Sequence, residues 1–236
     1  TAMVTLNQAL ADDYYILVRG SRTGSGLSLP NNDYARVTAV PYAVGEMNGS
    51  GATNLLELSR SVADFDWEGV VTVVECTNPS STSGFKLVDI LSTSLTGTSG
   101  SDNSASWSDV NQVVLFGGYR GGGASFVGTP TSRNQGTSVY TRLFPSGNNT
   151  LNWSRNAGGE TLVDAVMTTF VVEWGSAWNV QRVNVAGSSG GNGADVTGEY
   201  TTAGISSVSR DNTWVWGTGT RADAGIGDSA EACLIT

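Results

Sequence analysis

The feature that most constrains the fold is a series of short runs rich in β-branched and aromatic residues. The runs include YYILVRG, ARVTAVP, LLELSRSV, VVTVVEC, QVVLFGG, SVYTRLF, TLNWSRN, TTFVVEW and WNVQRVNV, and Gly, Ser, Asn and Asp separate them. Runs of this composition are favoured in strands, whereas the separating residues are typical of turns. No segment between the runs has the periodicity of an amphipathic helix. The sequence therefore predicts an all-β protein.

Five of the runs recur in the same order, at offsets between 95 and 104 residues. VVTVVEC (70–76) aligns with TTFVVEW (168–174), and the other aligned pairs are Leu17 with Leu115, Gly20 with Gly118, Arg22 with Arg120, Ser59 with Ser154 and Arg60 with Arg155. Insertions in hairpin loops account for the drift in offset, because such loops tolerate changes in length. The order of the runs predicts that a β-sandwich unit was duplicated.

We therefore predict two tandem antiparallel β-sandwich repeats of jelly-roll-like form, over residues 1–98 and 99–200, and a partial third over 201–236. NTWVWGTGTR (212–221) aligns with NQVVLFGGYR of the second repeat, while TAMVTL near the start is similar to a closing strand such as NVQRVNV. Residues 92–107 and 186–207, rich in Gly and Ser, are predicted linkers. A partial sandwich would expose unpaired backbone groups. We expect it to be completed by a neighbouring chain through β-strand addition, or by further sequence.

Composition excludes several classes of function. The net charge of −9 and the pI near 4.3 argue against nucleic-acid or membrane partners, since both need a positive surface. The chain has no histidine, which removes the usual general base and the commonest transition-metal ligand. We expect no enzymatic activity, no catalytic residue, no metal and no cofactor. Cys76 and Cys233 are too few for a disulfide framework, and either one bridge or two thiols fits the sequence.

The repeated strand carries a glutamate in each copy, Glu75 and Glu173, with apolar residues on both faces. Such a pattern is typical of a central strand covered on both sides. A carboxylate buried there needs a partner, because an unpaired buried charge is costly. The preceding strand ends in Arg60 in one copy and Arg155 in the other. We predict the structural ion pairs Glu75–Arg60 and Glu173–Arg155.

Two further patterns leave alternatives open. Asp64, Asp66, Glu68, Gly69 and Glu75 have the spacing of a calcium-binding loop, but the flanking sequence predicts a strand rather than helices, so we favour a solvated acidic hairpin. Six tryptophans could pack in the core or form platforms for sugar stacking, and core packing is the usual role. They are Trp107, Trp153, Trp174, Trp178, Trp214 and Trp216.

The order of short motifs resembles a β-sandwich repeat of tailed-phage virion proteins, namely tail-fibre, tail-associated or capsid-surface proteins. The motifs are LNWSR, TTFVVEW and NVQRV in the second unit and LELSR and TVVEC in the first, which departs from the pattern with GFKLVDI in place of VQRV. The resemblance implies a structural role at a virion surface, with copies of the chain or other virion proteins as partners, and it implies no enzymatic residues. The alternative is an extracellular adhesin or filament subunit that binds a surface glycan.

Overall fold

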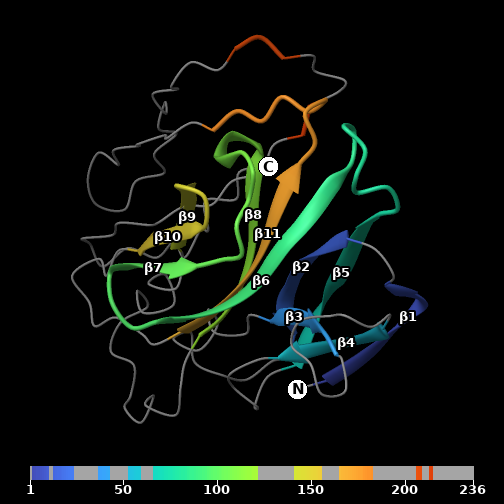
Figure 1. Cartoon of the computed structure of the whole chain (residues 1–236). Helices are drawn as coiled ribbons and strands as arrows, with labels where there is room; N and C mark the ends of the chain where they lie inside the picture. Colours follow the sequence, from blue (N-terminus) through green and yellow to red (C-terminus); the bar gives the residue numbers. More distant parts are fainter. Residues whose placement is uncertain are drawn as a thin grey trace.

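The structure is a computed structural model of the 236-residue chain. It describes residues 2–10, 13–23, 37–42, 53–59, 66–121, 141–155, 165–182, 206–208 and 213–214. Regular structure in these residues is β-strand throughout, apart from one turn of 3-10 helix, η2 (Val110–Gln112) (Figure 1). The prediction of an all-β fold of antiparallel sheets is confirmed.

The strands of the described residues form four antiparallel sheets, ordered β1-β4-β3, β2-β5, β6-β11-β8 and β7-β10-β9. Their bounds are β1 (Ala2–Leu10), β2 (Asp13–Thr23), β3 (Thr38–Pro41), β4 (Thr53–Ser59), β5 (Asp66–Cys76), β6 (Phe85–Leu95), β7 (Ser99–Asn103), β8 (Val113–Gly121), β9 (Thr141–Ser146), β10 (Thr150–Arg155) and β11 (Ala165–Trp174). The described residues of each predicted run before residue 178 lie wholly or mostly on one of these strands.

The pairing pattern of β1 to β5 recurs in β7 to β11. The orders β1-β4-β3 and β2-β5 correspond to β7-β10-β9 and β8-β11. Pro41 pairs with Leu56 between β3 and β4, and Pro145 pairs with Leu151 between β9 and β10. Both leucines are fully buried. β1 thus has the position in the first set of strands that β7 has in the second, rather than the closing position predicted for TAMVTL.

β6 joins the two sets of strands. It lies before residue 98, within the first predicted repeat, yet it pairs with β11 from Phe85 opposite Trp174 to Leu95 opposite Ala165. β11 is therefore the middle strand of its sheet, between β6 and β8 (Figure 1). The predicted boundary at residue 98 thus falls after a strand whose ladder partner, β11, lies in the second predicted repeat.

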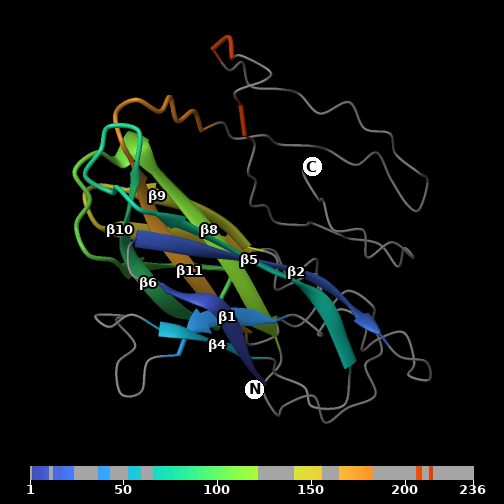
Figure 2. The same cartoon turned by 90° about the vertical axis from the view of Figure 1, so that its right-hand side faces the viewer.

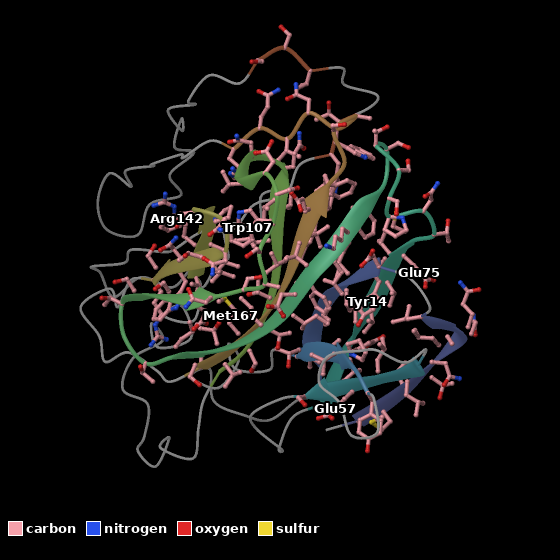
Figure 3. The ribbon with its side chains drawn as sticks, in the orientation of Figure 1. Tyr14, Glu57, Glu75, Trp107, Arg142 and Met167 are labelled. Carbon is pink, nitrogen blue, oxygen red and sulfur yellow. The ribbon has the colours of Figure 1, made fainter. Side chains whose placement is uncertain are left out.

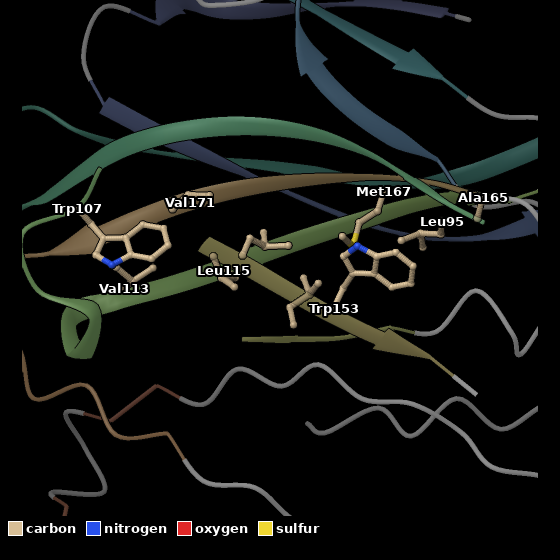
Figure 4. Close-up of a cluster of buried hydrophobic side chains, with 10 residues drawn as sticks. Leu95, Trp107, Val113, Leu115, Trp153, Ala165, Met167 and Val171 are labelled. Atoms are coloured by element: carbon tan, nitrogen blue, oxygen red, sulfur yellow. The ribbon is translucent and has the colours of Figure 1, made fainter. Parts of the chain in front are cut away.

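The β6-β11-β8 sheet is the middle layer, with a hydrophobic core on each face. Met167 and Val171 of β11 point to one core, and Phe170 and Val172 point to the other. The first core lies against β9 and β10 (Figure 4), and its buried members are Leu95, Trp107, Val113, Leu115, Leu143, Leu151, Trp153, Ala165, Met167 and Val171. The second lies against β1 to β4, and its buried members are Leu10, Tyr14, Tyr15, Ile16, Ala39, Leu56, Phe85, Phe116, Phe170 and Val172.

The two copies of the repeated strand are not equally covered. β11 is buried on both faces over most of its length, as the sequence predicts. β5 differs, because Val71 and Val73 pack against the second core while Thr72 is exposed and Val70 is 66% exposed. Among the described strands β5 pairs with β2 alone, and Figure 1 and Figure 2 show the two strands side by side. The prediction of a strand covered on both sides is therefore wrong for β5.

The first predicted linker, residues 92–107, contains the end of β6 and all of β7. β7 has low strand propensity and is held by its ladder to β10. Glycine is needed at position 100, since a Cβ there would lie 2.5 Å from Cζ2 of Trp153. At the other end of the chain, residues 178–182 of the predicted WNVQRVNV strand form no strand. No helix among the described residues is long and apolar enough to cross a membrane.

Tyr14 is expected to make the stability of the protein fall at alkaline pH. Burial, with the nearby charge of Asp13, raises the pKa of Tyr14 from 10.0 to about 12. Between these values the unfolded phenol is ionised while the folded one keeps its proton, so stability falls as pH rises. From pH 9 to pH 12 we expect wild type to lose about 1–2 kcal/mol more than Tyr14→Phe. Urea denaturation at both pH values measures this, and equal losses in the two proteins would contradict it.

Candidate functional site

Six aromatic side chains gather at one end of the middle sheet, and we call them the aromatic cluster. They are Tyr15, Phe85, Phe116, Trp174, Trp178 and Trp214. The Tyr15 and Phe116 rings stack with centroids 4.2 Å apart and an interplanar angle of 6°. Trp214 stacks on Phe116 at 5.4 Å and 23°. The base of the cluster is thus part of the second core.

The other side of the aromatic cluster is open to solvent. Trp178 is 43% exposed and Trp214 is 49% exposed, whereas Phe116 is 1% exposed. Trp174 lies between the two, with its ring centroid 4.6 Å from Trp178 and 6.4 Å from Trp214. The two exposed rings are therefore no more than about 11 Å apart, the sum of those distances. Exposed indole rings at this separation can stack on an apolar face of a sugar, a planar ring or another apolar surface.

Trp178 is held by hydrogen bonds from separate segments. Its Nε1 donates to the carbonyl of Ser83 at 2.8 Å, and Nε2 of Gln112 donates to the Trp178 carbonyl at 3.3 Å. The segment just before Trp178 lies close to the turn between β5 and β6, because the Gly175 N–H donates a hydrogen bond to the Gly84 carbonyl at 2.8 Å. The exposed ring is therefore positioned by the fold and does not project from a free loop.

Gly175 makes this close approach possible, and its substitution gives a prediction. A Cβ at position 175 would lie 2.3 Å from the carbonyl oxygen of Thr82, which is backbone and cannot move aside. Gly175→Ala is expected to lower the free energy of unfolding by about 1–3 kcal/mol and to shift Trp178 fluorescence. Gly97→Ala is the control, because its nearest atom is 3.8 Å away. Equal effects from the two substitutions in urea denaturation would contradict the prediction.

Glu173 ties the end of β11 to the segment before η2. Its Oε1 accepts hydrogen bonds from the backbone N–H of Ser108 at 2.8 Å, the Ser108 hydroxyl at 2.5 Å and the Asp109 N–H at 2.7 Å. Arg182 holds the same region, donating to the carbonyls of Val110 at 2.6 Å and Val113 at 2.8 Å. Both side chains fasten the region beside Trp178.

Arg155 lies at the opposite end of β11 and is buried. Its Nε donates to the Gly97 carbonyl at 2.7 Å and its Nη2 to the Leu95 carbonyl at 2.8 Å. Leu95 pairs with Ala165, and Glu173 is eight residues further along β11, which is about 26 Å in an extended strand. The structure thus does not bring Glu173 and Arg155 together. The physical reason is that β10 belongs to a different sheet from β11.

The other predicted pair is only partly described. Glu75 is half-buried on β5 and lies opposite Tyr14 of β2 (Figure 3). Arg60 lies outside the described residues, so the Glu75–Arg60 pair stays a prediction. Among the described strands, β5 is paired with β2 and not with β4, the strand that precedes Arg60.

The structure also places three other residues that the sequence singles out, namely Trp107, Trp153 and Cys76. Trp107 and Trp153 are buried in the first core, and Trp107 Nε1 donates to the Gly147 carbonyl at 2.9 Å. Cys76 is a free thiol whose sulfur accepts a hydrogen bond from the Phe85 N–H at 3.3 Å. Trp216, Cys233 and nearly all of the partial third repeat lie outside the described residues.

The acidic residues of the described part form no metal centre. No group of three or more Cys, Asp or Glu side chains in that part could hold a metal ion. The segment with calcium-loop spacing is extended strand from Asp66 onward, whereas a calcium loop must curve around the ion.

Comparison with known proteins gives no family. No family model matches the chain, and neither the curated proteins nor the solved structures contain a significant match.

Proposed function

We propose that the chain is a non-enzymatic structural protein of a virion surface, either in a fibre or as a capsid decoration, built from β-sandwich repeats. The observation that carries the structural role is the position of β6, which leaves the first set of strands and completes the sheet of the second. The virion assignment rests on the resemblance of the short motifs to repeats of tailed-phage proteins.

A shared strand suits a protein that transmits force or maintains spacing. Ten residue pairs join β6 to β11, so the two sets of strands cannot separate without breaking a ladder. Asp13 of β2 adds a second link, since its Oδ1 accepts a hydrogen bond from the Leu87 N–H of β6 at 3.0 Å. A flexible linker between repeats would allow the domain motion that a rigid fibre or shell must avoid.

The carboxylates of the described residues support a non-enzymatic role. Oδ2 of Asp102 accepts a hydrogen bond from the Thr93 hydroxyl. Asp89 accepts bonds from the backbone N–H groups of Ile90 and Ala105, both at 2.8 Å. Each of these carboxylates joins neighbouring segments, as Glu173 does, and this is the use expected of structural rather than catalytic groups.

Mass spectrometry of purified virions tests the proposal. The chain is expected at a fixed molar ratio to the major capsid protein, retained after washing in high salt, and labelled by antibody on the particle surface in electron micrographs. Its absence from purified particles of the phage whose genome encodes it would overturn the virion role.

The exposed part of the aromatic cluster favours a second candidate, an extracellular adhesin or filament subunit that binds a surface glycan. Trp178 and Trp214 present two exposed rings whose centroids are no more than about 11 Å apart. Burial of the apolar face of a sugar on such rings contributes roughly 25 cal/mol for each Å² removed from water. A glycan array identifies candidate ligands, and quenching of tryptophan fluorescence measures their binding.

Variants assign that binding to the aromatic cluster. Trp178→Ala and Trp214→Ala are each expected to weaken glycan binding roughly tenfold, which corresponds to the loss of one stacking partner. Tyr42→Ala is the control, since Tyr42 is an exposed aromatic residue just after β3, outside the aromatic cluster. A wild-type protein that binds no glycan on the array, or variants that bind as wild type does, would overturn the adhesin candidate.

A further inference from the structure

The outer edge of β5 is a long, regular strand edge. β5 pairs with β2 through eleven consecutive residue pairs, from Cys76 opposite Asp13 to Asp66 opposite Thr23, with no register shift. Within the described part of the chain, no strand pairs with its other edge. The side chains of Glu68, Val70 and Thr72 near the middle of the strand are exposed.

The equivalent edge of β11 accepts a strand. β11 pairs with β8 as β5 pairs with β2, and on its other side it pairs with β6 along ten residue pairs. β6 runs antiparallel to β11 and has eleven residues, the length of β5. The outer edge of β5 corresponds to the edge of β11 that pairs with β6. By this correspondence it can accept an antiparallel strand of similar length.

We propose that β5 of one copy pairs antiparallel with β5 of a second copy, so that the two β2-β5 sheets form one four-stranded sheet across the interface. The inference deepens the proposed structural role, on which it rests, by naming the partner and the surface. A two-fold interface of this kind forms a closed dimer, because the backbone groups of each β5 edge pair with those of the other copy.

The β5 strand has few of the features that usually protect an edge, and its charged side chains are the acidic ones Asp66, Glu68 and Glu75. Natural edge strands avoid pairing through proline, lysine, bulges or short length. Residues 66–76, DWEGVVTVVEC, contain no proline and no lysine, and the ladder with β2 has no bulge. Val70, 66% exposed, would be covered by the neighbouring strand of the second copy.

The geometry of antiparallel pairing also keeps Glu68 of one copy from facing Glu75 of the other. Two opposed residues either both direct their backbone groups across the interface or both direct them away. When a strand pairs with a copy of itself, opposed residues therefore have numbers that add to an even total. Glu68 can never face Glu75 of the second copy. With the two-fold axis at Val71, Glu68 faces Val74 and Val70 faces Thr72.

The experiment is sedimentation equilibrium of the full chain over about 1–100 μM, a range that covers weak to moderate dimers. Wild type is expected to dimerise. Val70→Lys combined with Thr72→Lys places like charges opposite each other and is expected to weaken the dimer at least roughly tenfold. Val70→Lys combined with Thr72→Glu places opposite charges face to face when the axis is at Val71, and the dimer is expected to be retained. Met3→Lys, at an exposed apolar site on β1, is the control and is expected to have no effect.

A wild-type chain that is monomeric over this range overturns the inference. So does a dimer that tolerates lysine at positions 70 and 72, or one that Met3→Lys weakens instead, because pairing would then use another surface. Circular dichroism of each variant confirms that it is folded. Particle mass spectrometry distinguishes the two proposals, since a monomeric chain that is still found in virions would overturn the β5 interface and leave the virion role intact.

Discussion

Replacement of Phe116 by alanine is expected to lower the free energy of unfolding by about 3–5 kcal/mol. Phe116 is 1% exposed and lies opposite Phe170 in the β8–β11 ladder. Its ring stacks on Tyr15 on one side of the second core and supports the exposed Trp214. Alanine would remove those contacts and leave a cavity between the middle sheet and β2, which the packed strands cannot fill by collapsing.

Urea denaturation followed by far-ultraviolet circular dichroism measures the loss. Met3→Ala is the matched control, because it also shortens an apolar strand residue but at a site on β1 that is 48% exposed. Its effect is expected to be within about 0.5 kcal/mol of zero. A loss below about 1 kcal/mol for Phe116→Ala would show that the second core is not packed around this ring.

Replacement of Arg155 by methionine is expected to cost about 3 kcal/mol or more. Methionine fills a similar volume but donates no hydrogen bond, so the carbonyl groups of Leu95 and Gly97 lose the partner that the guanidinium supplies. Arg142→Met is the control, since Arg142 on the neighbouring β9 is half-buried and stacks over the Phe144 ring at 4.9 Å. The control is expected to cost about 1 kcal/mol or less.

A double-mutant cycle with Glu173→Gln tests the separation of Glu173 and Arg155. The two side chains are fixed at opposite ends of β11, so the effects of Arg155→Met and Glu173→Gln are expected to add within about 0.5 kcal/mol. The ion pair predicted from the sequence would instead give a coupling energy of about 0.5–3 kcal/mol. Urea denaturation of both single variants and of the double variant provides the measurement.

The positions of the strands could be predicted from the sequence because composition and turn residues are local signals. The runs around Tyr15, Leu56, Val73, Leu151 and Val171 all lie in strands. Repetition of these runs also predicts a repeated unit, and the orders β1-β4-β3 and β7-β10-β9 are the strand pairings that bear on it.

The partners of the strands could not be predicted, because pairing depends on contacts between residues far apart in the chain. The alternating apolar residues of TTFVVEW indicate two covered faces but do not say that β6 pairs with β11. The predicted pairing of Glu173 with the arginine at the end of β10 assumes that consecutive strands are neighbours in one sheet. β10 instead pairs with β7 and β9 across the first core. β7 itself carries serine, glycine and aspartate, so it had the composition of a linker.

Only part of the aromatic cluster could be predicted from the sequence. Six tryptophans were candidates, and nothing in their spacing separated Trp107 and Trp153, which are buried, from Trp178, which is exposed. Tyr15, Phe85 and Phe116 were not singled out, since a ring in a strand shows its neighbours only once the sheets are stacked. Gly175 was missed for the same reason, because its close contact is with the distant Thr82.

The place of β6 beside β11 has a consequence for synthesis on the ribosome. Leu95 leaves the ribosome 70 residues before its partner Ala165, so at about 5–20 residues per second β6 waits several seconds for the strand it binds. During that interval the Leu87 amide can bond to Asp13, which is already made, and the nascent strand can rest on β2. The first half of the molecule would then be a template on which the second half folds. A pause in translation within residues 96–164 would lengthen the time during which β6 is unpaired and able to pair with another nascent chain.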